Sequence, residues 1–590
     1  MNSYKKLYDH FLLLQRATQK KVKQLGYLRL LAALLVVLGV YIFIKYGHNG
    51  AWISILLGLI AFIYLVKKQK ALTSLERYYG ARVNICTKEM RFLDGQKNVF
   101  DGGASFLTEN HNYSLDLDIF GSNSLFGHLN RTHTIQGAQI LAQYLSNASE
   151  MDVIKKRQLA VKELTPQSEW RQHVEAYAQL VNDTSENNRS IKSWISLSGG
   201  SLSALLRIAS FLFPILLAAS ISAYILSSNF IFIRIAIFIF LLQLSLVGFK
   251  LKEILNEVSL FDKIKDTLHH YIPLFDELEK HPFQAEVLKE LQSKLKGEND
   301  LASQNIEKLS VLVNNLSSIQ NLVGATIFNG LTCYHLHQYH TYLKWKKMHH
   351  TKLNTWLEAI AEWETLHSLA QFSYNNPEFA FPEFDADKID FENMAHPLLP
   401  ANRRISNSIS YNKSGTIILT GSNMSGKSTF LRTIGVNLVL ANCGSVVAST
   451  SAKFQPRQIL VSMRLDDSLA DSQSYFFAEI NRIKMIVEKM NQQNSFIILD
   501  EILRGTNSDD KRNGTIELLK KLKDQNATGI IATHDTEVCQ LTYQYSDYFR
   551  NKCFEVEIKE NDLYFDYVLR DGICQNKSAT FLMKKVGIIN

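Results

Sequence analysis

Cysteine is scarce in this chain of 590 residues, which contains only Cys86, Cys333, Cys443, Cys539, Cys553 and Cys574. None of them stands at the close paired spacing of zinc-binding cysteines, which excludes a cysteine-based metal site. The start of the chain does not fit a cleaved signal peptide, because the charged segment before the first apolar run is too long. We therefore interpret the cysteines as reduced, small core residues.

Proline is also scarce, and its distribution is uneven. Four of the nine prolines, at positions 377, 382, 397 and 400, fall in one short stretch. Such a stretch cannot be a continuous helix, so it predicts the entry into a new domain near residue 376. Internal repeats are absent, and the length is sufficient for three or four domains.

Charge identifies no partner by itself. The formal net charge is +8, with 20% charged and 46% hydrophobic residues. Many of the lysines flank apolar blocks, where anionic lipid headgroups account for them as well as a nucleic acid would. A basic balance therefore does not establish nucleic-acid binding here.

Four long apolar blocks are present, at residues 27–44, 51–66, 208–226 and 230–249. Each is close to the roughly 20 residues that cross a bilayer, and short polar turns join them in pairs. They predict two transmembrane hairpins, 27–66 and 204–249, in contact with the lipid bilayer. Lysines at 20, 21 and 23 and at 67, 68 and 70 flank the first hairpin, which predicts cytoplasmic termini at an inner or plasma membrane. The alternative is that these blocks are buried helices of a soluble protein. Arg207 and Arg234 make this alternative stronger for the second hairpin, because an ionised side chain is costly inside a membrane.

A complete phosphate-binding loop follows the proline-rich stretch. Residues 421–428 read Gly-Ser-Asn-Met-Ser-Gly-Lys-Ser, after a short apolar strand and before a run with helical spacing. This pattern curls backbone N–H groups around phosphate oxygens, while the lysine reaches the β- and γ-phosphates and the last hydroxyl ligates Mg²⁺. The predicted nucleotide-binding residues are Gly421, Ser422, Asn423, Met424, Ser425, Gly426, Lys427, Ser428 and Thr429. Lys427 is also a predicted catalytic residue, and Ser428 a predicted metal ligand.

Acidic residues end a second apolar strand about seventy positions later. Asp500 and Glu501 follow the strand at 496–499, and His534 follows another at 528–532. Ligands bind at the carboxyl ends of parallel strands, so Asp500 is predicted to hold Mg²⁺ through water and Glu501 to be the general base. His534 is predicted to hydrogen-bond the γ-phosphate or the attacking water. Together these motifs predict an ATPase.

The order of elements in this region indicates its fold. Strands near 416–420, 459–463, 496–499 and 528–532 alternate with helices at 429–441, 475–490 and 510–523. Alternation of this kind predicts a parallel sheet covered by helices. An antiparallel edge hairpin is predicted from 554–558 and 563–569. Strand-like runs are also predicted near 113–119, ahead of helices that begin after Thr134.

Four segments in this order resemble the MutS family of mismatch-recognition ATPases. They are residues 420–429, 466–479, 499–507 and 532–535, and residues 117–132, 157–164 and 396–399 extend the similarity upstream. The resemblance implies an ATP sandwich between two subunits, hence a homodimer through the ATPase domains. Ser474 of one subunit would then contact the γ-phosphate bound to the other, with residues 504–507 at the interface. By residue type and position alone, Ser474 fits a helix N-cap better than a phosphate contact, and it is the resemblance that favours the phosphate contact.

The combined prediction is a multidomain protein with four transmembrane helices in two hairpins, a helical MutS-like core and a C-terminal α/β P-loop ATPase domain of the ABC/MutS type. Its expected parts are a cytoplasmic segment 1–26, hairpin 27–66, core 67–200, hairpin 204–249, helical core or lever 250–375 and ATPase domain 376–590. The expected cofactors are ATP and Mg²⁺.

Departures from the family limit the functional expectation. Membrane helices stand where the family has its mismatch-reading domain, and the Phe-x-Glu wedge motif is missing, so direct mismatch reading is not expected. Arg404 stands where an adenine-stacking aromatic is expected and is predicted to stack in its place. The leading prediction is an ATP-dependent, membrane-anchored DNA-binding protein. The alternatives are an ATP-driven membrane protein for transport or protein remodelling without DNA binding, and a scaffold that uses ATP only as a clasp.

Overall fold

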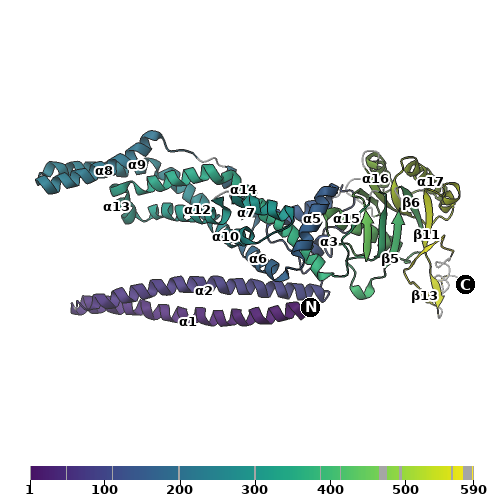
Figure 1. Ribbon diagram of the computed structural model, residues 1–590, viewed down its shortest axis with the longest axis horizontal. Coiled ribbons are helices and arrows are strands. Elements are labelled where there is room, and N and C mark those ends of the chain that lie inside the picture. Colours follow the sequence, from purple (N-terminus) through teal and green to yellow (C-terminus); the bar gives the residue numbers. More distant parts are fainter. Residues whose placement is uncertain are drawn as a thin grey trace.

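The computed structural model describes residues 2–47, 49–108, 110–196, 200–297, 300–385, 387–411, 414–463, 475–490, 494–559, 562–575 and 588. Its shape is elongated (Figure 1), with two helical hairpins at one end, a helical body in the middle and an α/β domain at the other end. Both hairpins point in the same direction, away from the α/β domain. The chain therefore separates its most apolar elements from its phosphate loop.

The first hairpin consists of α1 (Asn2–Tyr46) and α2 (Ala51–Leu93). The buried residues of α1 are Tyr4, Phe11, Thr18, Leu25, Ala32 and Gly39, a spacing of seven that forms a seam along the partner helix. A Cβ at Gly39 would lie 2.5 Å from Ser54 Oγ, so the two helices are in close contact near their apolar end. Helix α1 is continuous from Asn2 through the apolar block that ends near residue 44.

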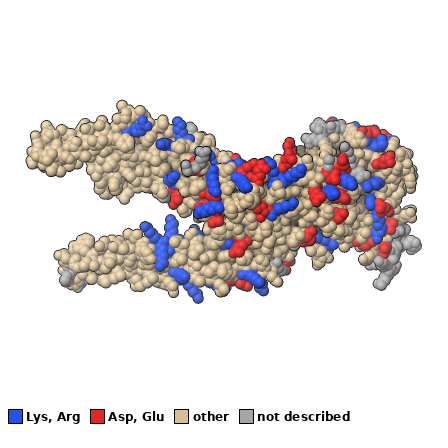
Figure 2. Space-filling model, in the orientation of Figure 1, with Lys and Arg blue, Asp and Glu red and all other residues tan. Residues whose placement is uncertain are grey.

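The second hairpin consists of α8 (Ala204–Ser227) and α9 (Phe230–Asp262). Together with α1 and α2, these helices are long and apolar enough to cross a membrane, by length and composition, and their most apolar windows are only 11–22% buried. Figure 2 shows that the tips of both helical hairpins carry almost no charged side chains, and that Lys and Arg side chains gather nearer the helical body. Such a distribution is typical of helices whose apolar part lies in a bilayer and whose flanking Lys and Arg side chains lie among the lipid headgroups.

The helical body lies between the hairpins and the α/β domain. It comprises α3 (Leu125–Leu129), α4 (Ile135–Ser146), α5 (Met151–Leu164), α6 (Ser168–Val181), α7 (Ser185–Ser196), α10 (Lys265–Lys280), α11 (Glu286–Leu295), α12 (Ala302–Ser317), α13 (Leu322–Thr332) and α14 (Tyr334–Asn375), with a two-stranded ribbon β1 (Lys296–Gly297) and β2 (Asp300–Leu301). Buried Glu89 of α2 pairs with buried Arg131, which fixes the first hairpin to this body.

The predicted strand near residues 113–119 is wrong, because this segment forms consecutive turns. Asp118 has a φ of 52°, which a β-strand does not allow. Tyr113, Leu117 and Ile119 are nevertheless buried in the main core. Their apolar spacing reflects burial between two domains and not a pleated strand. The helix predicted after Thr134 is confirmed as α4, and the Thr134 side chain caps it.

The α/β domain contains a six-stranded sheet in the order β14-β11-β6-β10-β9-β8. The strands are β6 (Gly415–Gly421), β8 (Gln458–Ser462), β9 (Ser495–Asp500), β10 (Thr528–Ala532), β11 (Phe549–Phe554) and β14 (Leu569–Asp571); the helices are α15 (Lys427–Cys443), α16 (Tyr475–Met490), α17 (Ser508–Asp524) and α18 (Leu541–Gln544). All neighbours pair in parallel except β14, which is antiparallel to β11. The predicted parallel sheet is confirmed. A second sheet, β3-β7-β4-β5, contains β3 (Glu383–Phe384), β4 (Ile389–Met394), β5 (Asn407–Tyr411) and β7 (Ser451–Phe454).

The predicted edge hairpin is only partly correct. The antiparallel pair is shorter, β12 (Glu557–Lys559) with β13 (Asp562–Tyr564), and it forms a sheet of its own. Phe554 belongs instead to β11, which pairs with β6, because its buried ring packs against Phe430 of the phosphate-loop helix. Leu569 begins β14, which closes the edge of the main sheet.

Candidate active site

The phosphate loop connects the buried central strand β6 to α15. Gly426, with a φ of 100°, stands directly before the first residue of the helix, a conformation that glycine adopts without strain. The Lys427 ammonium donates to the carbonyl oxygens of Gly421 at 2.8 Å and of Ser422 at 3.0 Å. Burial lowers the pKa of Lys427, while the charges of Glu501 and Asp500 oppose that shift. The loop therefore holds its lysine folded back on its own backbone, at the N-terminus of α15, where anions bind.

Ser428 and Asp500 lie together at the ends of their elements. Strands β6 and β9 flank β10 in the sheet, so both end at the same edge. The Ser428 hydroxyl donates to Asp500 Oδ2 at 2.6 Å. Asp500 Oδ1 is buried and has no hydrogen-bond partner among the residues that the structure describes. A buried carboxylate oxygen without a partner is costly, and a hydroxyl beside it completes the hard oxygen donors that Mg²⁺ prefers. The residues present therefore fit Mg²⁺.

Glu501 and His534 form a pair beside this site. Glu501 Oε1 and His534 Nε2 are 2.5 Å apart. The hydrogen bond from His534 lowers the pKa of Glu501 to about 2, with Arg504 and Lys427 adding to the effect against the cost of burial. The Glu501 carboxylate is therefore ionised at neutral pH, as a proton acceptor must be. The backbone of Glu501 has a φ of 48°, and its N–H donates to Ala532 O at 3.0 Å, which joins the ends of β9 and β10.

The loop after Glu501 is held by α16. Glu479 accepts hydrogen bonds from the backbone N–H of Leu503 at 2.7 Å and of Arg504 at 3.1 Å. The Arg504 side chain turns back to Glu501, with 3.6 Å between Nη2 and Oε2. Ser474, which the resemblance assigned to the partner's γ-phosphate, lies outside the described residues, directly before this helix. The structure thus connects the beginning of α16 to the acidic pair.

A cavity of about 440 Å³ opens at the phosphate loop and extends from Ser422 and Thr429 to Glu501. The predicted loop residues 422–429 line one side of it, while Ile405 and Tyr567 line its other side. A Cβ on Gly426 would lie 2.9 Å from Tyr567 Cδ1, so this ring lies directly against the loop. No sequence spacing indicated Tyr567, because it follows the loop by more than a hundred residues and belongs to no motif. Its position gives the cavity an aromatic wall.

Arg404 does not have the predicted position. Among the described residues, it is not one of those that line the nucleotide cavity. Its guanidinium donates to Leu399 O at 2.7 Å, pairs with Glu378 and lies over the ring of Phe379. These contacts fix the entry to the domain, and a guanidinium held by them cannot also stack on a base. The predicted stacking role of Arg404 is therefore wrong.

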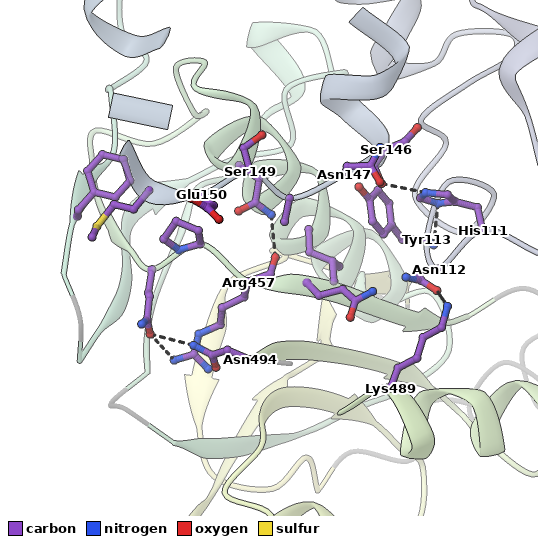
Figure 3. A pocket seen from close by; sticks show the side chains of 18 of the residues that line it. His111, Asn112, Tyr113, Ser146, Asn147, Ser149, Glu150, Arg457, Lys489 and Asn494 are labelled. Atoms are coloured by element: carbon purple, nitrogen blue, oxygen red, sulfur yellow. Dashed lines mark hydrogen bonds between the residues drawn. The ribbon is translucent and has the colours of Figure 1, made fainter. Parts of the chain in front are cut away.

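A second, larger cavity of about 1000 Å³ lies away from the phosphate loop, where the α/β domain meets the helical body. Figure 3 shows Lys489 of α16 reaching Asn112, at 2.6 Å, and His111 directed to the backbone of Ser146. Beside it, the Arg482 guanidinium donates to Asn112 O at 2.7 Å and Arg432 of α15 to Asp116 O at 3.1 Å. Both helices that border the nucleotide site therefore hold the turns at 112–118 of the helical body.

A phosphate loop before a helix, a buried acid at the end of a parallel strand and a second acid paired with histidine define a P-loop nucleoside-triphosphatase. Residues 417–588 match the family model described as MutS domain V. This C-terminal part of the chain is therefore a MutS-type ATPase domain, which implies ATP binding. The resemblance and the enzyme class predicted from the motifs are confirmed.

Individual relatives with low sequence identity support this assignment. The DNA mismatch repair protein MutS of Thermotoga sp. (strain RQ2) is 28% identical over 248 residues, 41% of this chain and 31% of that protein. The protein of the same name from Fusobacterium nucleatum is 33% identical over 202 residues, 33% of this chain and 22% of that protein. The human MutS protein homolog 4 is 29% identical over 223 residues, 36% of this chain and 23% of that protein. The matched part spans less than a third of each relative.

Proposed function

We propose that this protein is a membrane-anchored MutS-like ATPase that uses ATP binding and hydrolysis in a dimeric sandwich to close on DNA. The observation that carries the proposal is the site itself. Lys427, Ser428 and Glu501 line one cavity, with Asp500 bonded to Ser428 and His534 paired with Glu501, in a chain that also has two parallel apolar hairpins. The relatives that carry the same domain are named for DNA mismatch repair, which supports DNA as the partner.

The residues of the site have distinct roles in the proposed reaction. Lys427 leaves the carbonyl oxygens of Gly421 and Ser422 and binds the β- and γ-phosphates of ATP, while loop N–H groups bind the remaining oxygens. Ser428 and Asp500 hold Mg²⁺, which supplies positive charge against the phosphates. Glu501 accepts the proton of the attacking water, and His534 orients the Glu501 carboxylate.

Dimerisation completes the site in this proposal. Glu479 connects α16 to the backbone that follows Glu501, so a subunit that contacts the region before α16 can change the geometry of the general base. The family resemblance supplies Ser474 of the partner subunit as the group that reaches the γ-phosphate. Residues 504–507 belong to the same interface. Hydrolysis then requires two chains.

The membrane placement follows from the two hairpins and their flanking charge. We propose that 27–66 and 204–249 cross an inner or plasma membrane, with both termini and the ATPase domain in the cytoplasm. The segment 1–26, the core parts 67–200 and 250–375 and the ATPase domain 376–590 then lie on the cytoplasmic side. Lysines on both sides of the first hairpin support this orientation.

A second candidate is an ATP-driven membrane protein that acts on a solute or a protein partner without DNA. Helix α14 favours it, because a continuous helix of 42 residues, about 60 Å long, connects the body to the second hairpin. Near its start, His337 Nε2 lies 3.1 Å from Ser210 O of α8, while Glu364 near its other end bonds the backbone of His133. Such a helix can carry movement from the ATPase side to the membrane.

DNA binding distinguishes the two candidates. The full-length Glu501→Gln protein in detergent is incubated with duplex, mismatched and branched DNA, with and without ATP, at a stated salt concentration. We expect ATP to tighten binding by about 10-fold or more, the size of a typical coupling between two sites. Lys427→Ala is the matched control, because ATP should have no effect on its DNA affinity.

The contrary result is weak binding that ATP does not change and that moderate salt removes. A chain with a net charge of +8 gives this background with any polyanion. It would contradict DNA as the partner and favour the candidate that acts within the membrane or on a protein. Nucleotide-dependent solute flux in liposomes would then identify the transport form of that candidate.

A further inference from the structure

Helix α13 is a short apolar helix that lies outside the two predicted transmembrane hairpins. It spans Leu322–Thr332, too few residues to cross a bilayer. Its outer face consists of large apolar side chains, with Leu322 80%, Val323 71% and Phe328 58% exposed. Contiguous apolar surface of this kind needs a partner or a non-aqueous environment.

The surrounding sequence is equally unusual. Residues 309–343, from the second half of α12 to the first turns of α14, contain no Asp, Glu, Lys or Arg. Charge returns at Lys308 on one side and Lys344 on the other. A long interval without charge at the end of a helical hairpin is expected where water is absent, and it is costly on a soluble surface.

The position of α13 links it to the second hairpin. Gly330 lies against Phe240 of α9 so closely that a Cβ would be 2.1 Å from the Phe240 ring. Phe240 stands 10 residues after Phe230, the start of α9, and 10 before Lys250. At 1.5 Å per residue each interval is about 15 Å, half of a hydrocarbon layer of roughly 30 Å. In Figure 1, α13 lies beside α8 and α9, set back from the tip of that hairpin.

The polar side chains of α13 have partners within the protein. The hydroxyls of Thr326 and Thr332 donate to the carbonyl oxygens four residues earlier, both at 2.8 Å. Asn321 caps the helix by accepting from the Gly324 N–H, and Asn329 accepts from the His335 N–H. Lipid offers no hydrogen bonds, so internal pairing is the condition for a polar group to stay there.

We propose that α13 is a re-entrant helix embedded in the bilayer leaflet nearer the ATPase domain, with its exposed apolar face against lipid acyl chains. This inference rests on the proposed membrane placement of α8 and α9, with which its apolar surface is continuous. The helical body would thus enter the membrane itself. The α12–α13–α14 segment becomes a second connection between the bilayer and the ATPase domain, beside the covalent one through α9.

The test uses full-length protein with Cys574→Ser, because the other five native cysteines are buried. Single cysteines replace Phe238, Phe328 or Met348, which are 66%, 58% and 56% exposed and lie on α9, α13 and the part of α14 beyond Lys344. Each carries an environment-sensitive fluorophore in liposomes that contain lipids with nitroxide groups on the acyl chains. ATP turnover of each labelled protein verifies the fold.

We expect the probe at Phe328→Cys to be quenched as strongly as that at Phe238→Cys and several-fold more than that at Met348→Cys. Quenching at Phe238 with none at Phe328 would overturn the embedded α13 but leave the proposed anchoring intact. Absence of quenching at both positions would overturn the anchoring and the inference together. The three positions therefore separate failure of the inference from failure of the proposed function.

Discussion

Replacing Glu501 with glutamine is expected to leave ATP bound and to lower its turnover by on the order of 100-fold or more, the usual contribution of a general base. Glutamine has the size of glutamate but cannot accept the proton of the attacking water. The low pKa of Glu501, about 2, means that the native side chain is ionised over the whole neutral range, so the substitution removes a charge that is always present. ATP affinity and single-turnover hydrolysis are the measurements.

The matched control for this variant is Glu517→Gln. Glu517 is an exposed carboxylate on α17 that pairs with Lys520, away from the cavity. Its replacement should leave both binding and turnover unchanged. Turnover by Glu501→Gln at the native rate would remove Glu501 from the role of general base, and His534 would then be the next residue to test.

Replacing Lys427 with alanine is expected to abolish detectable nucleotide binding at concentrations that saturate the native protein. The ammonium is buried at the loop and has two backbone acceptors that ATP phosphates can replace. Hydrogen bonds to charged groups contribute about 1.5–3 kcal/mol each, so losing those to two phosphates weakens binding by about 100-fold or more. Binding of a fluorescent ATP analogue measures the effect.

Lys520→Ala is the control for the lysine variant, since Lys520 is a surface lysine that pairs only with exposed Glu517 among the described residues. It should bind ATP like the native protein. Because Lys427 also braces the loop backbone, thermal unfolding in the absence of nucleotide should be compared as well. Native ATP affinity in a folded Lys427→Ala protein would contradict the assignment of this loop as the phosphate site.

The ATPase motifs could be predicted from the sequence because their functional polar residues directly follow buried apolar strands. Strand β10 has the predicted bounds, and α16 does as well, since apolar runs between polar turns leave few alternatives. The predicted helix from 510 begins two residues earlier, at Ser508, because the Asn507 side chain caps it. Local sequence patterns were sufficient to predict a helix or strand wherever that element buries a single face.

Predictions were wrong where the environment comes from distant parts of the chain. The apolar residues at 113–119 resemble a strand, yet they form turns that Arg482 and Arg432 of another domain hold. Tyr567 reaches the phosphate loop through tertiary structure alone. Helix α13 was too short for a transmembrane pattern, and its place beside the apolar hairpin, where Gly330 meets Phe240, comes from tertiary structure.

The central claim, an ATP sandwich built from two chains, is tested most directly by mixing two inactive variants. Lys427→Ala removes the phosphate site of its own chain, and Ser474→Ala removes the group that the resemblance assigns to the partner's site. Each variant alone should hydrolyse little ATP. A mixed dimer, however, contains one intact site, made of the native loop of one chain and the native Ser474 of the other.

ATP turnover of the equimolar mixture in detergent is therefore the measurement, with co-purification of two different tags to verify that mixed dimers form. Random pairing makes half of the dimers mixed, each with one active site of two, so the account predicts recovery of about a quarter of the native rate. A mixture no more active than the separate variants, despite mixed dimers, would contradict the sandwich. Full activity of Ser474→Ala alone would contradict it as well.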